Sequence, residues 1–199
     1  TRIVADMTAS PPVVYFTDYA GRTVGRLPVT GGDVEVFATV PDQGNQARYG
    51  NIVVHGDFVY WAMQRENLDA NAGKDIWRAK RQAIGAAAVT AERVIANDRP
   101  LALVADDVYL YFGNSQSNTI ERIPWSALGD GAALPATSET LATDAAQTPG
   151  GDIGEMAVDD EFLYWGSEAT VWAMPKGTPG AARTAIGPAP SWVGILLAD

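Results

Sequence analysis

Cysteine is absent from the 199 residues of the chain, which excludes disulfides, thiolate catalysis and cysteine-ligated metal centres. His55 is the only histidine, so the sequence predicts neither a histidine-based metal cluster nor a catalytic histidine beside a nucleophile. No apolar run approaches the roughly 18 residues that cross a bilayer, so direct membrane insertion is not expected. Basic residues are few, with 14 Lys and Arg against 24 Asp and Glu. A nucleic-acid partner is therefore not expected, because binding phosphates requires a basic surface.

The chain is rich instead in apolar residues and in turn formers. Hydrophobic residues make up 47% of it, which is enough for a buried core and argues against disorder. The 20 glycines and 12 prolines indicate frequent turns, as in a fold of many short strands. The net charge of −10 is most simply a means of keeping the surface soluble.

A stretch that reads DVYLYFGN over residues 107–114 recurs three more times. The copies are PVVYFTD (12–18), DFVYWAM (57–63) and EFLYWGS (161–167). Their matching tyrosines lie 45, 51 and 53 residues apart and are Tyr15, Tyr60, Tyr111 and Tyr164. A period of this length indicates an array of similar supersecondary units.

Each repeat is predicted to form four short strands, separated by turn-rich segments. In the third repeat the expected strands are 101–105, 108–112, 119–124 and 139–143. The tyrosine strand carries large apolar groups on both faces, as a sheet packed between two others requires. A two-layer sandwich, the second choice, would alternate more cleanly between apolar and polar residues. The sequence therefore predicts an all-β fold, a β-propeller of four-stranded antiparallel blades.

The blade repeats span approximately residues 1–40, 51–97, 100–144 and 152–187, with an extra strand at 192–198. We expect a single propeller domain or propeller segment, either a four-bladed ring or part of a ring of six to eight blades. The innermost strand of the first blade is supplied either by residues 2–5 or by the strand at 192–198. Because the pattern is cut where other repeats continue, we expect a piece of a longer chain.

Residues 14–27, which read VYFTDYAGRTVGRL, resemble the repeat of YWTD-type propellers and also the repeats of NHL-type and virginiamycin B lyase-like propellers. The resemblance covers most of the chain, but only the first repeat keeps the Thr-Asp pair, at Thr17 and Asp18. It implies a disc whose loops on one face bind protein, peptide, sugar or a small molecule. The lyase-like propellers are expected to use histidine for catalysis, and the single histidine here, in a turn, speaks against that chemistry.

Acidic residues recur at the turn between the first and second strands of the repeats. They are Asp57, the pair Asp106 and Asp107, and the pair Asp159 and Asp160. Recurrence at one position is what a turn requirement produces, because Asp bonds its own backbone. The segment 69–75, DANAGKD, comes closest to a calcium loop but lacks the regular spacing and the closing Glu. We therefore expect no catalytic residue, metal or cofactor.

The repeats differ most in their loops. The loop that follows the second tyrosine strand, residues 64–74, and the link at 41–50 are both long. Such loops project from one end of a blade, and loops on a rigid scaffold are where recognition is placed. The candidate binding residues are Arg48, Tyr49, Arg65, Asn67, Asp69, Tyr19 and Asn114.

The sequence favours a non-enzymatic propeller, a scaffold for protein binding or assembly outside the cytoplasm, in a secreted, periplasmic or cell-surface setting. The expected partner is a protein or a larger assembly, with a small molecule or glycan as a further ligand. Two alternatives stay open: a lyase or hydrolase that acts through carboxylates at the central mouth, and a lectin-like sugar-binding propeller. Fold alone does not decide among them.

Overall fold

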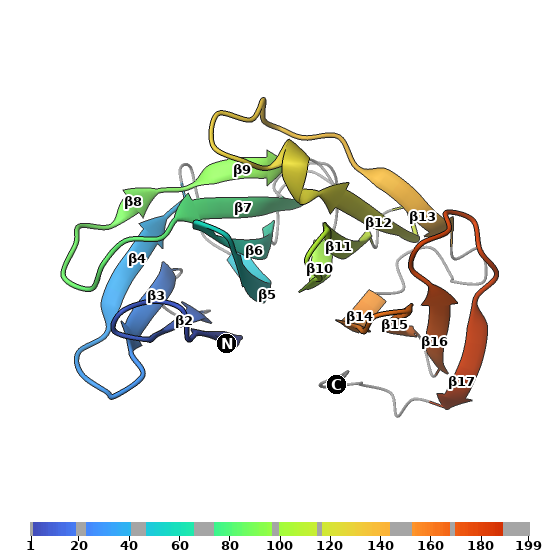
Figure 1. The fold of residues 1–199 in the computed structure, drawn as a ribbon, viewed down its shortest axis with the longest axis horizontal. Coiled ribbons are helices and arrows are strands. Elements are labelled where there is room, and N and C mark those ends of the chain that lie inside the picture. The colour runs from blue at the N-terminus through green and yellow to red at the C-terminus, as the bar shows by residue number, and fades with distance from the viewer. Residues whose placement is uncertain are drawn as a thin grey trace. The chain divides into compact units, whose positions relative to one another are not determined.

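The structure, a computed structural model, describes residues 2–18, 23–40, 47–65, 74–96, 100–114, 117–143, 153–167 and 170–188. The chain divides into two compact units, an N-terminal unit (Thr1–Asn97) and a C-terminal unit (Asp98–Asp199). Each unit contains two sheets whose strands follow the order of the chain, as the colours of Figure 1 show. Within the described residues, no helix is long and apolar enough to cross a bilayer.

The first sheet of the N-terminal unit contains four antiparallel strands and a fifth, parallel one. The four are β1 (Ile3–Asp6), β2 (Val13–Asp18), β3 (Thr23–Pro28) and β4 (Glu35–Thr39). Val4 lies opposite Tyr15, so the first residues of the chain supply the innermost strand. The alternative strand at 192–198 lies outside the described residues. The fifth strand, β8 (Val89–Thr90), runs parallel to β4, with Val89 opposite Ala38.

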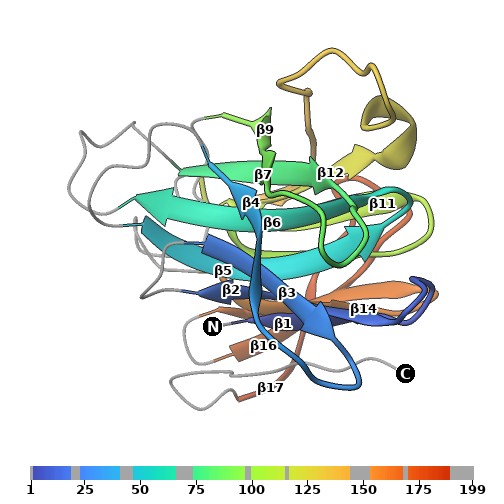
Figure 2. The same cartoon turned by 90° about the vertical axis from the view of Figure 1, so that its left-hand side faces the viewer.

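The second sheet of this unit contains four antiparallel strands. They are β5 (Ala47–His55), β6 (Phe58–Arg65), β7 (Lys74–Lys80) and β9 (Glu92–Ile95). Figure 2 shows β5, β6 and β7 side by side.

The C-terminal unit repeats the arrangement twice. Its first sheet contains β10 (Pro100–Ala105), β11 (Tyr109–Asn114), β12 (Thr119–Pro124) and β13 (Glu139–Thr143), with a short 3-10 helix, η1 (Trp125–Ala127), after β12. Its second sheet contains β14 (Ile153–Val158), β15 (Phe162–Ser167), β16 (Thr170–Pro175) and β17 (Thr184–Pro188). The predicted four-stranded antiparallel sheets are thus confirmed.

Apolar side chains from neighbouring sheets form the core of each unit. Trp61 and Trp165 are fully buried, one in each unit, as their strand positions predict. Sheets approach closely where a glycine replaces a side chain: a Cβ on Gly113 would lie 2.5 Å from Cγ2 of Ile153 on the adjacent sheet. Burial of such large apolar groups on both faces of the tyrosine strand supplies most of the stabilisation, at roughly 25 cal/mol per Å².

Candidate functional site

An aspartate lies at the end of the innermost strand of three of the four sheets: Asp6 is the last residue of β1, and Asp106 and Asp159 directly follow β10 and β14. In the third sheet, Oδ1 of Asp106 accepts hydrogen bonds from the backbone amides of Val108 and Tyr109, both at 2.8 Å. Oδ1 of Asp159 makes the equivalent bonds in the fourth sheet, at 2.8 and 2.7 Å. These carboxylates close turns, which confirms the structural role predicted for the recurring acids.

The second oxygen of each of these two carboxylates holds the tyrosine of the next strand. The hydroxyl of Tyr111 donates to Oδ2 of Asp106 at 2.9 Å, and that of Tyr164 donates to Oδ2 of Asp159 at 2.7 Å. Burial and the bond to Asp106 hold the pKa of Tyr111 well above its usual value. The bond to Asp159 raises the pKa of Tyr164. Both tyrosines are therefore neutral donors in ordinary conditions.

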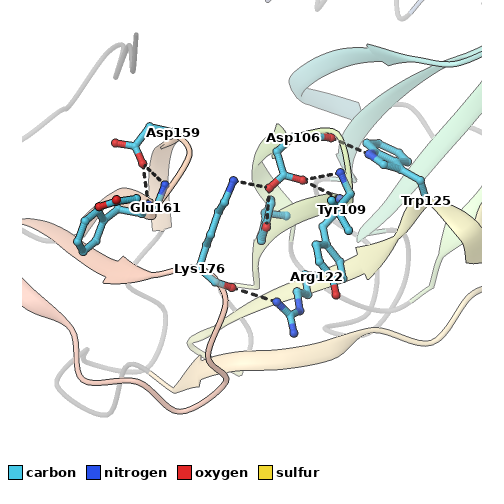
Figure 3. A network of polar contacts seen from close by, with 10 residues as sticks. Asp106, Tyr109, Arg122, Trp125, Asp159, Glu161 and Lys176 are labelled. Carbon is cyan, nitrogen blue, oxygen red and sulfur yellow. Dashed lines mark hydrogen bonds and ion pairs between the residues drawn. The ribbon is translucent and has the colours of Figure 1, made fainter.

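A cation from the following sheet completes the network in the C-terminal unit (Figure 3). Lys176, just after β16, donates to Oδ2 of Asp106 at 2.8 Å. Its backbone carbonyl accepts a bond of 3.0 Å from Nη1 of Arg122, and the carbonyl of Asp106 accepts one of 2.7 Å from Trp125. Burial acts to raise the pKa of Asp106, but the bonds from Lys176, the turn amides and Tyr111 hold it below its usual value. We call this contact between a turn aspartate and the cation of the next sheet the inter-blade lock.

The N-terminal unit has the same lock. Nη1 of Arg81, just after β7, donates to Oδ2 of Asp6 at 2.6 Å. Oδ1 of Asp6 accepts bonds from the backbone amides of Thr8 and Ala9 and from the Thr8 hydroxyl, at 3.0, 3.2 and 2.7 Å. Burial opposes ionisation of Asp6, yet the bonds from Thr8 and Arg81 hold its pKa below the usual value.

Three sheets also share an arginine whose position in the repeat was not predicted from the sequence. It lies opposite the tyrosine on the third strand and bonds a glutamate on the fourth. The pairs are Arg26 with Glu35, Arg78 with Glu92 and Arg122 with Glu139, at 2.9, 2.9 and 2.8 Å. In the sequence, this arginine follows the tyrosine of its repeat by 11 or 18 positions. The pattern is hard to recognise because the hairpins that join the two strands differ in length.

The first sheet departs from the pattern at Tyr15. Nine positions separate Asp6 from Tyr15, whereas five separate Asp106 from Tyr111. Tyr15 is only 1% exposed and packs edge-on against Phe37, with ring centroids 4.8 Å apart. No hydrogen bond to its hydroxyl is made by the residues that the structure describes. Burial and the charge of Asp6 raise its pKa, so the hydroxyl is neutral.

A cavity of about 340 Å³ opens beside Tyr15 in the N-terminal unit, and we call it the unit-1 cleft. It lies where the turn after β1 meets the connection after β7. Its polar lining includes Asp6, Tyr15, Asp57, Lys80 and Arg81, and its apolar lining includes Pro11, Val13 and Ile84. The size is at the lower end of the range for small-molecule sites. The cleft can bind a small ligand through charged and apolar groups together.

The charges of the unit-1 cleft balance, since it has two carboxylates and two cationic side chains. Asp6 and Arg81 form a close pair at the cleft wall. Asp57 is more open: its side chain is 70% exposed, and its Oδ1 lies 3.9 Å from Nη2 of Arg81. Among the described residues, no group of three or more His, Cys, Asp and Glu could hold a metal ion.

The residues that the sequence proposed for binding lie elsewhere. Arg48 and Tyr49 are in β5 and Arg65 ends β6, so their assignment to loops was wrong. The reason is that the hairpin ladder continues beyond its apolar part, with Arg48 opposite Gln64. Asn114 ends β11, is 3% exposed and donates to Oε1 of Glu121 at 2.9 Å, so its side chain belongs to the interior.

The remaining candidates, Tyr19, Asn67 and Asp69, lie outside the described residues. His55 ends β5, at the position that Asp106 and Asp159 occupy in their own sheets.

A scan against models of protein families finds no match, and a search among curated protein sequences finds none either. Solved structures do match. A chain of a nidogen/laminin complex is 17% identical, with a TM-score of 0.65, and the match covers 96% of this chain and 65% of that one. A luciferin-regenerating enzyme is 12% identical, with a TM-score of 0.62 and coverage of 92% and 62%.

A third match is a calcium-binding protein, regucalcin, from Agrobacterium tumefaciens, at 15% identity and a TM-score of 0.59. It covers 86% of this chain and 55% of the other, so the chain spans less than two thirds of the length of each of these three. At such identities the likeness concerns the fold, and the neighbours include both a protein complex and an enzyme. Together with the four repeated antiparallel sheets, it shows that this chain has the β-propeller fold.

Proposed function

We propose that this chain is a non-enzymatic binding propeller that holds a ligand in the unit-1 cleft. The observation that carries the proposal is the departure of Tyr15 from the repeat pattern. Tyr111 and Tyr164 use their hydroxyls to bond a turn aspartate, whereas the Tyr15 hydroxyl lines a cavity without such a bond. A hydroxyl that faces a cavity without a protein partner is available to a ligand, and a hydrogen bond to it contributes about 0.5–1.5 kcal/mol.

The other repeats serve as internal controls for this reading. In the third and fourth sheets the turn is short and the aspartate meets the tyrosine directly. In the first sheet the longer turn contributes Ala9, Ser10 and Pro11 to the walls of the cavity. The longer turn thus coincides with a cavity and with a Tyr15 hydroxyl that bonds no turn aspartate, as expected of a binding site added to a repeated scaffold.

The protonation of the carboxylates supports binding over hydrolysis. The pKa values of Asp6, Asp106 and Asp159 are held below their usual value by hydrogen bonds that outweigh any effect of burial. A general acid or base works best with a pKa near the operating pH. These groups stay ionised and act in the turns, and in the case of Asp6 and Asp106 also in the inter-blade locks.

Protein binding and an extracytoplasmic location belong to the same proposal. In the N-terminal unit the second strands, β2 and β6, begin beside the unit-1 cleft and run away from it, and we assign contact with a protein partner to the segments that follow them. Arg48 and Arg65 lie in the hairpin that leads to one of these segments. The neighbour described as a nidogen/laminin complex supports such a role for the fold.

A fragment screen by ligand-observed NMR tests the proposal. The 199-residue chain, its Tyr15→Phe variant and its Tyr111→Phe variant are each screened against the same library. We expect a set of fragments that bind the parent chain and the Tyr111→Phe variant, lose affinity for Tyr15→Phe and remain chemically unchanged. The proposal is contradicted if the fragments bind the Tyr15→Phe variant as tightly as the parent chain, or if they are converted to products.

The surface for a protein partner has a separate test. Cross-linking of the purified chain should capture a partner that is lost when Arg48→Glu and Arg65→Glu are combined. Capture that is unchanged by the double substitution refutes this placement.

A further inference from the structure

Arg81 presents unused hydrogen-bond donors to the unit-1 cleft. Its guanidinium carries five N–H donors. Nη1 donates to Oδ2 of Asp6 at 2.6 Å and to Oγ1 of Thr8 at 3.0 Å. Within the described part of the chain, Nη2 approaches only Asp57, at 3.9 Å, which is beyond hydrogen-bond distance. One edge of the guanidinium is therefore fixed by the inter-blade lock, and the other is available to a ligand.

Tyr15 and Arg81 favour a carboxylate as one ligand group. The side chain of Arg81 is 26% exposed, and Tyr15 is 1% exposed while it lines the same cavity. An acceptor with two oxygens can bond the guanidinium edge and the phenol together, and planar carboxylates suit arginine in this way. A dianion gains no net attraction, because the two carboxylates of the lining offset its two cationic side chains.

Asp57 favours an ammonium as a second ligand group. Its side chain is 70% exposed, and its carboxylate, which lines the cleft, accepts no hydrogen bond from the described residues. The backbone amide of Arg81 donates to the carbonyl of Asp57 at 2.8 Å, so the two residues are held side by side. An anion-binding edge and a cation-binding carboxylate thus lie next to each other. In an α-amino acid the carboxylate and the ammonium are likewise separated by a single carbon.

The rest of the lining favours a net-neutral ligand with an apolar body. Asp6 and Asp57 are balanced by Lys80 and Arg81, so a ligand with net charge gains no general attraction. Pro11, Val13 and Ile84 supply apolar contacts on the same cavity. Packing of a branched apolar side chain against such a wall is favourable, because it removes apolar surface from water.

We propose that the unit-1 cleft binds a small zwitterion, an α-amino acid with an apolar side chain. Its carboxylate bonds Tyr15 and the free edge of Arg81, its ammonium bonds Asp57, and its side chain packs on Pro11, Val13 and Ile84. This inference rests on the proposed function, because it names the ligand of that same cleft. It distinguishes a free amino acid from the end of a peptide, which carries only one of the two charges.

Three probes that share the leucine side chain test the inference by calorimetric titration of the 199-residue chain. They are L-leucine, L-leucinamide, which lacks the carboxylate, and N-acetyl-L-leucine, which lacks the ammonium. We expect L-leucine to bind and each derivative to bind roughly tenfold or more weakly, the loss of one charge-assisted hydrogen bond. The variant Tyr15→Phe should weaken L-leucine by roughly tenfold, and its fold is not at risk because only the hydroxyl is removed.

Matched variants separate the two charged contacts. Asp57→Asn should weaken L-leucine roughly tenfold and leave the already weak N-acetyl-L-leucine unchanged. Tyr111→Phe and Asp107→Asn, the latter at an exposed aspartate of the C-terminal unit, should leave both affinities unchanged. If Asp57→Asn weakens both probes equally, the ammonium contact is wrong and the inference is overturned.

Failure of the inference can be told from failure of the proposed function. If a derivative binds as tightly as L-leucine and still depends on Tyr15, the zwitterion is wrong but the cleft is a binding site. If none of the three probes binds in a Tyr15-dependent way, the zwitterion is likewise overturned, and the fragment screen decides the proposed function independently.

Discussion

Replacing Tyr111 by Phe should destabilise the chain, whereas the same change at Tyr15 should not. Both rings are buried to 1% exposure, so the apolar packing of the two substitutions is comparable. The difference is the hydroxyl: that of Tyr111 donates to ionised Asp106 at 2.9 Å, and that of Tyr15 has no hydrogen bond within the described residues. The pair therefore isolates one hydrogen bond on a repeated scaffold.

The magnitude follows from the acceptor. A hydrogen bond to a charged group contributes about 1.5–3 kcal/mol to stability. In the Tyr111→Phe variant, Asp106 still bonds Lys176 and two turn amides, so we expect a loss at the lower end of this range, about 1.5 kcal/mol. The Tyr15 hydroxyl faces the unit-1 cleft and has no protein partner among the described residues, so we expect its removal to change the free energy of unfolding by between zero and a gain of about 1 kcal/mol. The two variants should thus differ by about 2 kcal/mol in the free energy of unfolding.

Urea unfolding followed by tryptophan fluorescence measures this difference. The parent chain and both variants are fitted with the same dependence of the unfolding free energy on urea concentration. At this chain length the difference corresponds to roughly 4–8 °C in the melting temperature. Equal losses in the two variants would refute the reasoning, because they would show that Tyr15 also has a stabilising partner in the folded chain.

Two further predictions concern the locks and the contact between sheets. The pKa values of Asp6 and Asp106 are lower in the folded chain than in the unfolded chain, so the unfolded chain binds more protons as the pH falls. The stabilisation that the two ionised carboxylates contribute is therefore present above about pH 4 and is lost as the pH falls through their folded-state pKa values. Urea midpoints should fall over that window, and the double variant Asp6→Asn with Asp106→Asn should show a shallower fall. Gly113→Ala would place a Cβ 2.5 Å from Cγ2 of Ile153, and we expect it to lower the free energy of unfolding by about 1–3 kcal/mol. An unchanged urea midpoint would contradict the close approach of the two sheets at Gly113.

Much of the fold could be predicted from the sequence because period-2 alternation and repetition are local signals. The four copies of the tyrosine strand fix the spacing of the sheets, and the buried Trp61 and Trp165 lie where that pattern puts them. The short strand β8 could not be predicted, since its pairing with β4 depends on contacts made far along the chain. The strands that hold Arg48 and Arg65 were also underestimated, because polar residues can continue a hairpin ladder.

The candidate site could not be predicted for a different reason. Its residues come from the turn after β1, the turn before β6 and the connection after β7, and their chemistry depends on a difference in geometry. The longer turn after Asp6 was visible in the sequence, but its effect on the Tyr15 hydroxyl was not. Asn114 shows the converse, since a residue taken for a loop position is buried and bonded to Glu121.

Amide-resolved NMR during a titration with L-leucine shows directly whether the unit-1 cleft binds a zwitterionic amino acid. We expect chemical-shift changes to concentrate in residues 6–15, at Asp57 and in residues 80–84, and we expect Tyr15→Phe to diminish them. Changes confined to the C-terminal unit, or changes around the cleft that Tyr15→Phe leaves intact, would refute binding of the amino acid through Tyr15.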